Sequence, residues 1–143
     1  MMDKKPTHQM NDSEINHRLR AHEITPTQQR VDIARILFAR PQHMSAEQVL
    51  SVVNRDGQVV SKATIYNTLN LFARKGLVRE VIVDPSKVFY DSNVSDHHHF
   101  FNVDSGELMD IDSRELSLDR LPTLPEGTEA DGVDVIIRIR SRS

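Results

Sequence analysis

The chain has 143 residues, enough for one or two small domains, and it contains no cysteine, which excludes disulfides, thiolate zinc sites and iron–sulfur clusters. The formal net charge of −3 hides an asymmetry: residues 14–83 hold ten Lys/Arg against six Asp/Glu, and residues 84–143 hold six against thirteen. The basic segment suits a polyanionic partner, whereas the acidic segment, which holds a run of three histidines, suits a cation. Uneven solvation of two ordinary surfaces is the alternative, and charge alone does not decide between them.

The chain also lacks the apolar segments that membrane proteins need. No apolar run approaches the ~20 residues of a membrane span, and the N-terminus has no signal-peptide core. We therefore expect a cytoplasmic protein without a membrane partner.

The first half of the chain has helical periodicity. Residues 1–12 are polar and predict a loose arm, and residues 13–22 predict a first helix only weakly. In "TPTQQRVDIARILFAR", Thr25 is the predicted N-cap, Pro26 the first helical residue, and Pro41 the end of the helix.

Two further helices have clearer start signals. Ser45 with Gln48 predicts a capping box, and Ser61 predicts the cap of a third helix that ends before Gly76. Short helices in this order, with tight connections, predict a helix-turn-helix arrangement.

The periodicity then changes to that of strands. "LVREVIV" and "KVFYD" flank a turn at residues 84–86 and predict a hairpin, which makes the order that of a winged helix. "HHFFNV", "ELMDI" and "VDVIIRIR" predict three more strands, "SRELSLDRL" a short helix, and "PTLPEGTEADG" a loop. The predicted fold class is α+β, with a winged helix-turn-helix domain over residues 13–92 and a small α/β domain over residues 93–143.

The start of the third helix has the side chains that a recognition helix needs. Such a helix reads DNA with hydroxyl, amide and cationic side chains near its N-terminus. The predicted DNA-binding residues are Ser61, Lys62, Thr64, Tyr66 and Asn67. Tyr66 suits either a thymine methyl group or a phosphate. The alternative is an ordinary amphipathic helix with a polar outer face.

The histidine run indicates a metal site. If the segment around residues 97–101 is extended, His97 and His99 share one face and His98 points away from them. Without cysteine, the remaining ligands must be nitrogen or oxygen atoms, and we expect Asp91 and Asp110 on neighbouring strands. His43, in the loop before the second capped helix, is the remaining well-placed imidazole. This set of three histidines and two aspartates suits Fe(II), Mn(II) or Zn(II). The alternative is that each histidine is a solvated or hydrogen-bonded side chain without a metal, as most single histidines are.

An enzyme is not predicted. The sequence has no nucleophile elbow, no phosphate-binding loop and no His-Glu-x-x-His motif, and two small domains leave little room for a deep cleft.

Five motifs together resemble the ferric uptake regulator superfamily. They are "TPTQQRVDI", "HMSAEQVL", "SKATIYNTLNLFARKGLV", "VFYDSNVSDHHHF" and "VDSGELMDI", and the match covers residues 14–112 in register. Within the superfamily, the HHH run, the Tyr-Asp pair before it and the absence of cysteine resemble most the iron response regulator (Irr) group.

The resemblance implies a homodimeric, metal-responsive repressor or activator that binds a palindromic operator through its winged helix. It implies a regulatory metal site between the domains, formed by His43, Asp91, His97, His99 and Asp110. Fe(II) or Mn(II) is the expected ion, with Zn(II) as the third option. The recognition tyrosine of the superfamily falls on Tyr66. Irr-like proteins also bind haem through the HHH run, which implies haem near His97, His98 and His99.

Three departures qualify the resemblance. Many members hold a structural zinc with two CxxC pairs, but the first pair falls here on Asn102 and Ser105, so no structural zinc held by four cysteines is expected. His98 falls on a ligand of a second metal site, whose late histidine is missing, with Asp134 nearby instead. The Cys-Pro haem motif of some Irr proteins is absent, so haem-triggered degradation through it is not predicted.

Two other functions stay open at this point. Asp91 matches the pattern of peroxide sensors, in which bound Fe(II) drives oxidation of a ligand histidine. A protein of another class, a metal-binding or storage module without sequence-specific DNA binding, is the third hypothesis.

Overall fold

The computed structural model describes residues 10–57, 60–95 and 97–142, which form two compact units. The first unit ends at Val94 and the second begins at Ser95. Most of the predicted N-terminal arm lies outside the described residues. None of the described helices combines the length and the apolar composition that crossing a bilayer requires.

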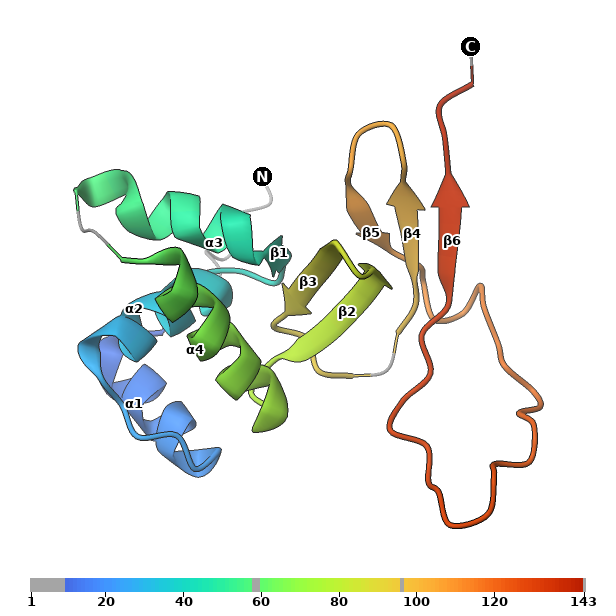
Figure 1. The fold of residues 1–143 in the computed structure, drawn as a ribbon, viewed down its shortest axis with the longest axis horizontal. Coiled ribbons are helices and arrows are strands. Elements are labelled where there is room, and N and C mark those ends of the chain that lie inside the picture. The colour runs from blue at the N-terminus through green and yellow to red at the C-terminus, as the bar shows by residue number, and fades with distance from the viewer. Residues whose placement is uncertain (1–9, 58–59, 96, 143) are drawn as a thin grey trace, which may run out of the picture. The chain divides into compact units, whose positions relative to one another are not determined.

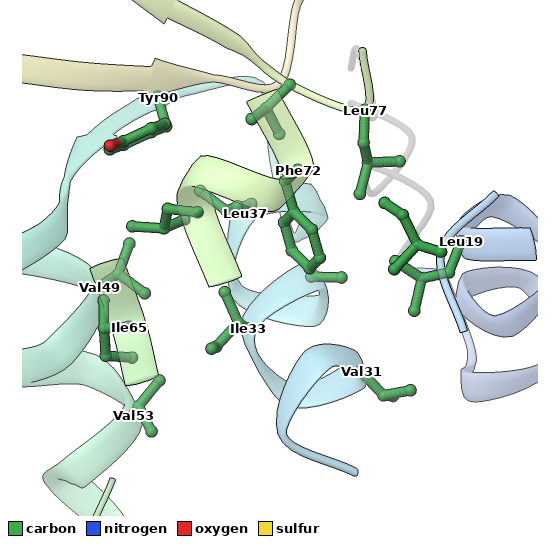
Figure 2. Packing of buried hydrophobic residues seen from close by; sticks show 14 of the residues in the cluster. Leu19, Val31, Ile33, Leu37, Val49, Val53, Ile65, Phe72, Leu77 and Tyr90 are labelled. Carbon is green, nitrogen blue, oxygen red and sulfur yellow. The ribbon is translucent and has the colours of Figure 1, made fainter. Parts of the chain in front are cut away.

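The first unit begins with helices and ends with a small sheet (Figure 1). Its helical elements are α1 (Asp12–Ala21), α2 (Gln28–Phe38), α3 (Ala46–Val53), the 3-10 turn η1 (Asn54–Asp56) and α4 (Lys62–Arg74). Their apolar faces meet in one core, in which Phe72 of α4 is fully buried among side chains of the neighbouring helices (Figure 2). The helices depend on this shared core, because isolated helices of 8–13 residues are marginal in water.

Side-chain caps fix where these helices start. Ser45 accepts a hydrogen bond from the Gln48 N–H while Gln48 Oε1 accepts from the Ser45 N–H, so the predicted capping box is confirmed. Ser61 caps α4 as predicted, by accepting from the Thr64 N–H at 3.1 Å. The predicted start of α2 is wrong: Thr27, not Thr25, is the N-cap. Because α2 begins at Gln28, Pro26 precedes the helix, and the carbonyl of Thr25 accepts a hydrogen bond from the Arg30 guanidinium at 2.8 Å.

The end of α4 turns the chain into the sheet. Gly76 has φ of 76°, the left-handed conformation that glycine adopts at low cost. The Leu77 N–H then bonds to the Phe72 carbonyl at 2.9 Å, and the Gly76 N–H to the Ala73 carbonyl at 3.1 Å. This Schellman motif satisfies the last carbonyls of α4 and brings buried Leu77 to the start of the hairpin.

The sheet of the first unit has the order β1-β3-β2, with both pairings antiparallel. β2 (Arg79–Asp84) and β3 (Lys87–Asp91) form the predicted hairpin. The prediction that His43 lies in a loop is wrong: His43 belongs to β1 (His43–Ser45), which pairs with the edge of β3 opposite to β2. Tyr90 of β3 joins the sheet to α4, because its hydroxyl donates to Asn70 Oδ1 at 3.0 Å.

The second unit is a three-stranded sheet of order β5-β4-β6 (Figure 1). β4 (His99–Asn102) pairs antiparallel with β5 (Leu108–Asp110) and parallel with β6 (Ile136–Ile139), so the three predicted strands are confirmed. Asn102 closes the turn between β4 and β5, since its Oδ1 accepts from the Asp104 and Ser105 N–H groups at 2.9 and 3.2 Å. Hydrogen bonds from the backbone to one amide side chain therefore hold this turn.

The short helix predicted at residues 113–121 is wrong: this segment lies in a connection without helix or strand. Asp112 Oδ1 accepts from the Arg114 N–H at 2.9 Å, a local bond that competes with helix formation. Leu118 and Leu121 are exposed, so no buried face would stabilise a helix here. The proline that follows, Pro122, disfavours helical backbone at the residue before it.

Loss of the α3 cap should weaken the first unit measurably. Ser45→Ala removes the acceptor for the Gln48 N–H, and we expect the free energy of unfolding to fall by about 1 kcal/mol. Urea denaturation followed by helical circular dichroism measures this unit, because the described helices all belong to it. Ser51→Ala, at an exposed position inside α3, is the control and should be neutral or slightly stabilising. Equal losses in the two variants would contradict the role of the cap.

Candidate metal centre and nucleic-acid interface

The first unit brings together two of the five predicted metal ligands. His43 of β1 and Asp91 of β3 are direct partners in the antiparallel register, so their side chains leave the sheet on the same face. A ring nitrogen of His43 and a carboxylate oxygen of Asp91 lie within 4.8 Å of each other. We call this pair the first half-site.

Local contacts orient both members of the first half-site. Asp91 Oδ1 accepts from the Asn93 N–H at 2.8 Å, which fixes the carboxylate at the end of β3. The His43 ring contacts the Phe89 ring edge to face, with 6.2 Å between centroids. Asp91 is a buried carboxylate, and such a group is stable only where cations or hydrogen-bond donors compensate its charge.

The second unit brings together the other three ligands, His97, His99 and Asp110. His99 of β4 and Asp110 of β5 are direct register partners. The rings of His97 and His99 lie on one side of the chain, with 4.5 Å between centroids, as the predicted alternation requires. His97 Nε2 and His99 Nε2 approach the same atom, Asp110 Oδ1, at 3.3 and 3.2 Å. We call these three residues the second half-site.

The tautomer of His97 makes the second half-site attractive to cations. Its Nδ1 lies 2.8 Å from the Ser95 carbonyl oxygen, which can only accept, so Nδ1 carries a proton. In the neutral ring, Nε2 then presents a lone pair to the carboxylate oxygen of Asp110, which is also an acceptor. Only a proton or a metal ion makes this approach favourable. The 3.2–3.3 Å separations match the spacing of about 3.0–3.4 Å between neighbouring ligand atoms on one divalent ion.

His98 stands apart from both half-sites. Its Nδ1 accepts a hydrogen bond from the Val135 N–H at 2.9 Å, so in the neutral ring the proton is on Nε2. A bond from Nε2 to a metal ion or to haem iron would therefore require loss of that hydrogen bond or of that proton.

The two predicted carboxylate ligands lie in different sheets. Asp110 is on a strand beside β4, but Asp91 is on β3, in the sheet of the first unit. Along the chain β3 directly precedes β4, as predicted, but Asp91 pairs with β1 and β2 rather than with the strand of His99. Its actual neighbour, His43, lies 48 positions earlier, which the hairpin pattern alone does not reveal.

The predicted DNA-reading residues lie at the start of α4. Ser61 and Thr64 are joined by a hydroxyl–hydroxyl hydrogen bond of 2.9 Å, and the ammonium of Lys62 lies 5.7 Å from the centroid of the Tyr66 ring. Asn67 and Thr64 line a groove whose other wall is the start of α2. Gln29 and Arg30, which sequence reasoning missed, complete that wall with polar side chains of the kind that contact phosphates.

Sequence reasoning also missed Glu47. The Tyr66 hydroxyl donates a hydrogen bond to Glu47 Oε1 on α3. This bond lowers the pKa of Glu47 and raises the pKa of Tyr66. Nineteen residues separate the pair, and no local pattern connects them.

Comparison with known proteins agrees with this architecture. A profile described as "Ferric uptake regulator family" matches residues 21–130. The peroxide-responsive repressor PerR of Staphylococcus aureus (strain USA300) is 30% identical over 110 residues, which cover 77% of this chain and 73% of that protein.

Solved structures show the same fold. The ferric uptake regulator from Pseudomonas aeruginosa with manganese has a TM-score of 0.66 and 26% identity, covering 90% of this chain and 98% of that one. The ferric uptake regulator of Vibrio cholerae has a TM-score of 0.68 and 20% identity, covering 88% and 98%. The predicted α+β fold class is confirmed: an N-terminal winged helix-turn-helix domain precedes a small C-terminal unit.

Removal of the charge at Asp110 tests the second half-site. Asp110→Asn keeps the shape of the side chain but removes the negative charge from the group that both imidazoles approach, which makes it a poorer metal ligand. Loss of a residue that only orients a metal ligand weakens metal binding by about 10- to 100-fold. For loss of a proposed ligand we therefore expect the dissociation constant for Mn(II), measured by electron paramagnetic resonance of the free ion, to rise more than about tenfold.

Asp112→Asn is the matched control. Asp112 lies two positions on, where Arg114 lowers its pKa through an exposed ion pair. Its variant should bind Mn(II) within about twofold of the parent, because exposed pairs contribute little. Similar losses of Mn(II) affinity in both variants would indicate a general effect of negative charge and would contradict the role of Asp110 as a ligand.

Proposed function

The chain belongs to the ferric uptake regulator family of metal-responsive transcription regulators, and we propose that it binds a palindromic operator as a homodimer when a divalent ion occupies its half-sites. Members of this family are regulators rather than enzymes, in agreement with the absence of catalytic motifs from the sequence. Because it would bind an operator, we propose that the protein acts in the same compartment as the DNA.

The metal part of the proposal is that a single ion takes ligands from both half-sites. Neither half-site completes a coordination sphere by itself: the first offers one imidazole and one carboxylate, and the second offers two imidazoles and one carboxylate. Together, His43, Asp91, His97, His99 and Asp110 supply five ligands, within the range that divalent first-row metals use. The observation that carries the proposal is the approach of two imidazole nitrogens to one oxygen of Asp110.

The chemistry of these ligands favours Fe(II) or Mn(II), with Zn(II) as the third option. Three imidazoles and two carboxylates form a mixed nitrogen and oxygen set, and the sequence has no cysteine to favour a softer ion. The Pseudomonas aeruginosa relative, solved with manganese, supports the same class of ion.

The DNA part of the proposal is that α4 enters the major groove of the operator. Ser61, Lys62, Thr64, Tyr66 and Asn67 would make the contacts from its first two turns. The groove between α4 and the start of α2 supports a phosphate contact beside them, through Arg30. A homodimer would repeat this arrangement, which is why we expect a palindromic site.

A metal-dependent operator assay tests the proposed function. A duplex selected from a randomised library is labelled and titrated with protein in Mn(II) and in EDTA, with fluorescence anisotropy as the readout. We expect binding about 5- to 150-fold tighter with Mn(II), the usual range for coupling between two sites. His97→Ala should abolish most of this difference, whereas His98→Ala, outside both half-sites, should retain it.

The same assay separates the alternatives. Absence of any selected sequence, with Mn(II) still bound, would support a metal-binding module and contradict the proposal. Operator affinity that is the same in Mn(II) and EDTA would leave a DNA-binding protein whose half-sites do not regulate it.

Peroxide sensing is a second candidate function, supported by the 30% identity to a peroxide-responsive repressor. In that case Fe(II) in the site would react with peroxide and oxidise a ligand histidine. Peptide mass spectrometry detects the added oxygen on His43 or His97, and its absence after peroxide treatment of the Fe(II) form would exclude this function.

The narrower Irr-type function, with haem at His97, His98 and His99, stays a prediction. The hydrogen bond from Val135 to His98 Nδ1 makes the middle histidine the least available of the three for iron. Haem added to the operator assay tests it directly: release of the operator by haem would support the Irr-type function, and the hydrogen bond at His98 Nδ1 predicts unchanged haem affinity after His98→Ala.

A further inference from the structure

Glu47 is an acidic residue on a surface that the proposed function turns towards DNA. It is the second residue of α3, and its carboxylate accepts the hydrogen bond from the Tyr66 hydroxyl. A carboxylate beside phosphates weakens binding to every sequence alike, because it opposes the electrostatic attraction that dominates protein–DNA affinity. The hydrogen bond to Tyr66 is the contact through which Glu47 would affect specificity instead.

The contact between Glu47 and Tyr66 is held in place from both sides. The capping box of Ser45 and Gln48 fixes the start of α3, and the Ser61 cap fixes the start of α4. The two helices share one buried core, to which α3 contributes Val49 and α4 contributes Ile65 (Figure 2). The carboxylate and the phenol therefore meet across two elements whose relative position is set by packing.

The Tyr66 ring is restrained at its edge and at its face. Glu47 binds the hydroxyl, and Lys62, one helical turn earlier, places its ammonium 5.7 Å from the ring centroid. Because the hydroxyl proton is committed to Glu47, the phenol does not donate it to a phosphate. The part of Tyr66 that can contact a base is therefore its apolar ring. The apolar group that bases present in the major groove is the thymine methyl group.

We propose that Glu47 is a positioning residue that sets the base preference of Tyr66, by holding the ring where it reads a thymine methyl group. The inference rests on the proposed function, because it requires α4 to contact operator DNA. It predicts that Glu47 lowers affinity for DNA in general while raising discrimination at one thymine.

The test uses the full-length protein with Mn(II) and its selected operator. Each thymine is replaced in turn by deoxyuridine, which removes only the methyl group, and anisotropy gives the affinity for each duplex. The parent protein should lose about fourfold at the thymine that Tyr66 reads, the effect of one buried methyl group. Glu47→Ala and Tyr66→Phe should each lose that discrimination, and the double variant should lose no more than either one.

Two further variants separate position from charge. Glu47→Gln keeps an oxygen that accepts the phenol hydrogen bond, so it should retain the discrimination while binding random DNA about two- to fivefold more tightly. Glu23→Gln removes an equivalent charge beside Lys75, away from the pair, and should retain the parent discrimination. Circular dichroism and thermal unfolding confirm that each variant is folded.

The outcomes distinguish the two levels of the argument. If the parent protein selects no operator, the proposed function fails before any variant is compared. If the parent binds an operator and Glu47→Ala shows the parent pattern of thymine sensitivity, the inference is overturned. Equal loss of discrimination in Glu47→Gln and Glu47→Ala would also overturn it, because the charge rather than the acceptor position would then be responsible.

Discussion

One oxygen atom, Asp110 Oδ1, faces two imidazole nitrogens at 3.2–3.3 Å, and the account of this protein depends on that arrangement. The pairing of β4 with β5 brings His99 opposite Asp110, and strand alternation brings His97 to the same side. The Ser95 carbonyl fixes the proton of His97 on Nδ1, so its Nε2 faces the carboxylate as an acceptor. Two positively charged imidazoles this close would repel each other, whereas a single divalent ion satisfies all three groups. The second unit therefore gathers three of the five proposed ligands by its own strand pairing.

The first unit holds two of the proposed ligands, His43 and Asp91, together with the helix that is proposed to read DNA. Asp91 ends β3, and the residue before it, Tyr90, donates a hydrogen bond to Asn70 on α4. Burial raises the pKa of Tyr90 to about 12, so its hydroxyl remains a donor throughout the physiological range. The proposed ligand Asp91 and the helix α4, which is proposed to read DNA, thus belong to one packed unit. Under the proposed function, an ion that also binds the second unit would restrict the orientation of the first unit, and it would favour DNA binding only through its differential affinity for the competent arrangement.

Much of this architecture could be predicted from local sequence, because it depends on short-range chemistry. The caps at Ser45 and Ser61, the glycine after α4 and the alternation of His97 and His99 all act within a few residues. The sequence predictions failed where contacts between segments far apart in the chain determine the structure. β1 exists because β3 provides a partner for His43, and the Glu47–Tyr66 contact exists because α3 packs on α4. The helix expected at residues 113–121 is absent because Leu118 and Leu121 are exposed and give it no buried face, a fact that the periodicity of the sequence does not reveal.

The central claim is that a single divalent ion takes ligands from both half-sites, and Mn(II) binding measured by isothermal titration calorimetry on His43→Ala and His97→Ala tests it most directly. These two histidines belong to different units. The account predicts one tight Mn(II) per chain in the parent protein, and a weakening of that same binding event by either substitution. Unchanged tight binding in His43→Ala, with loss only in His97→Ala, would contradict the claim and leave a metal site built by the second unit by itself.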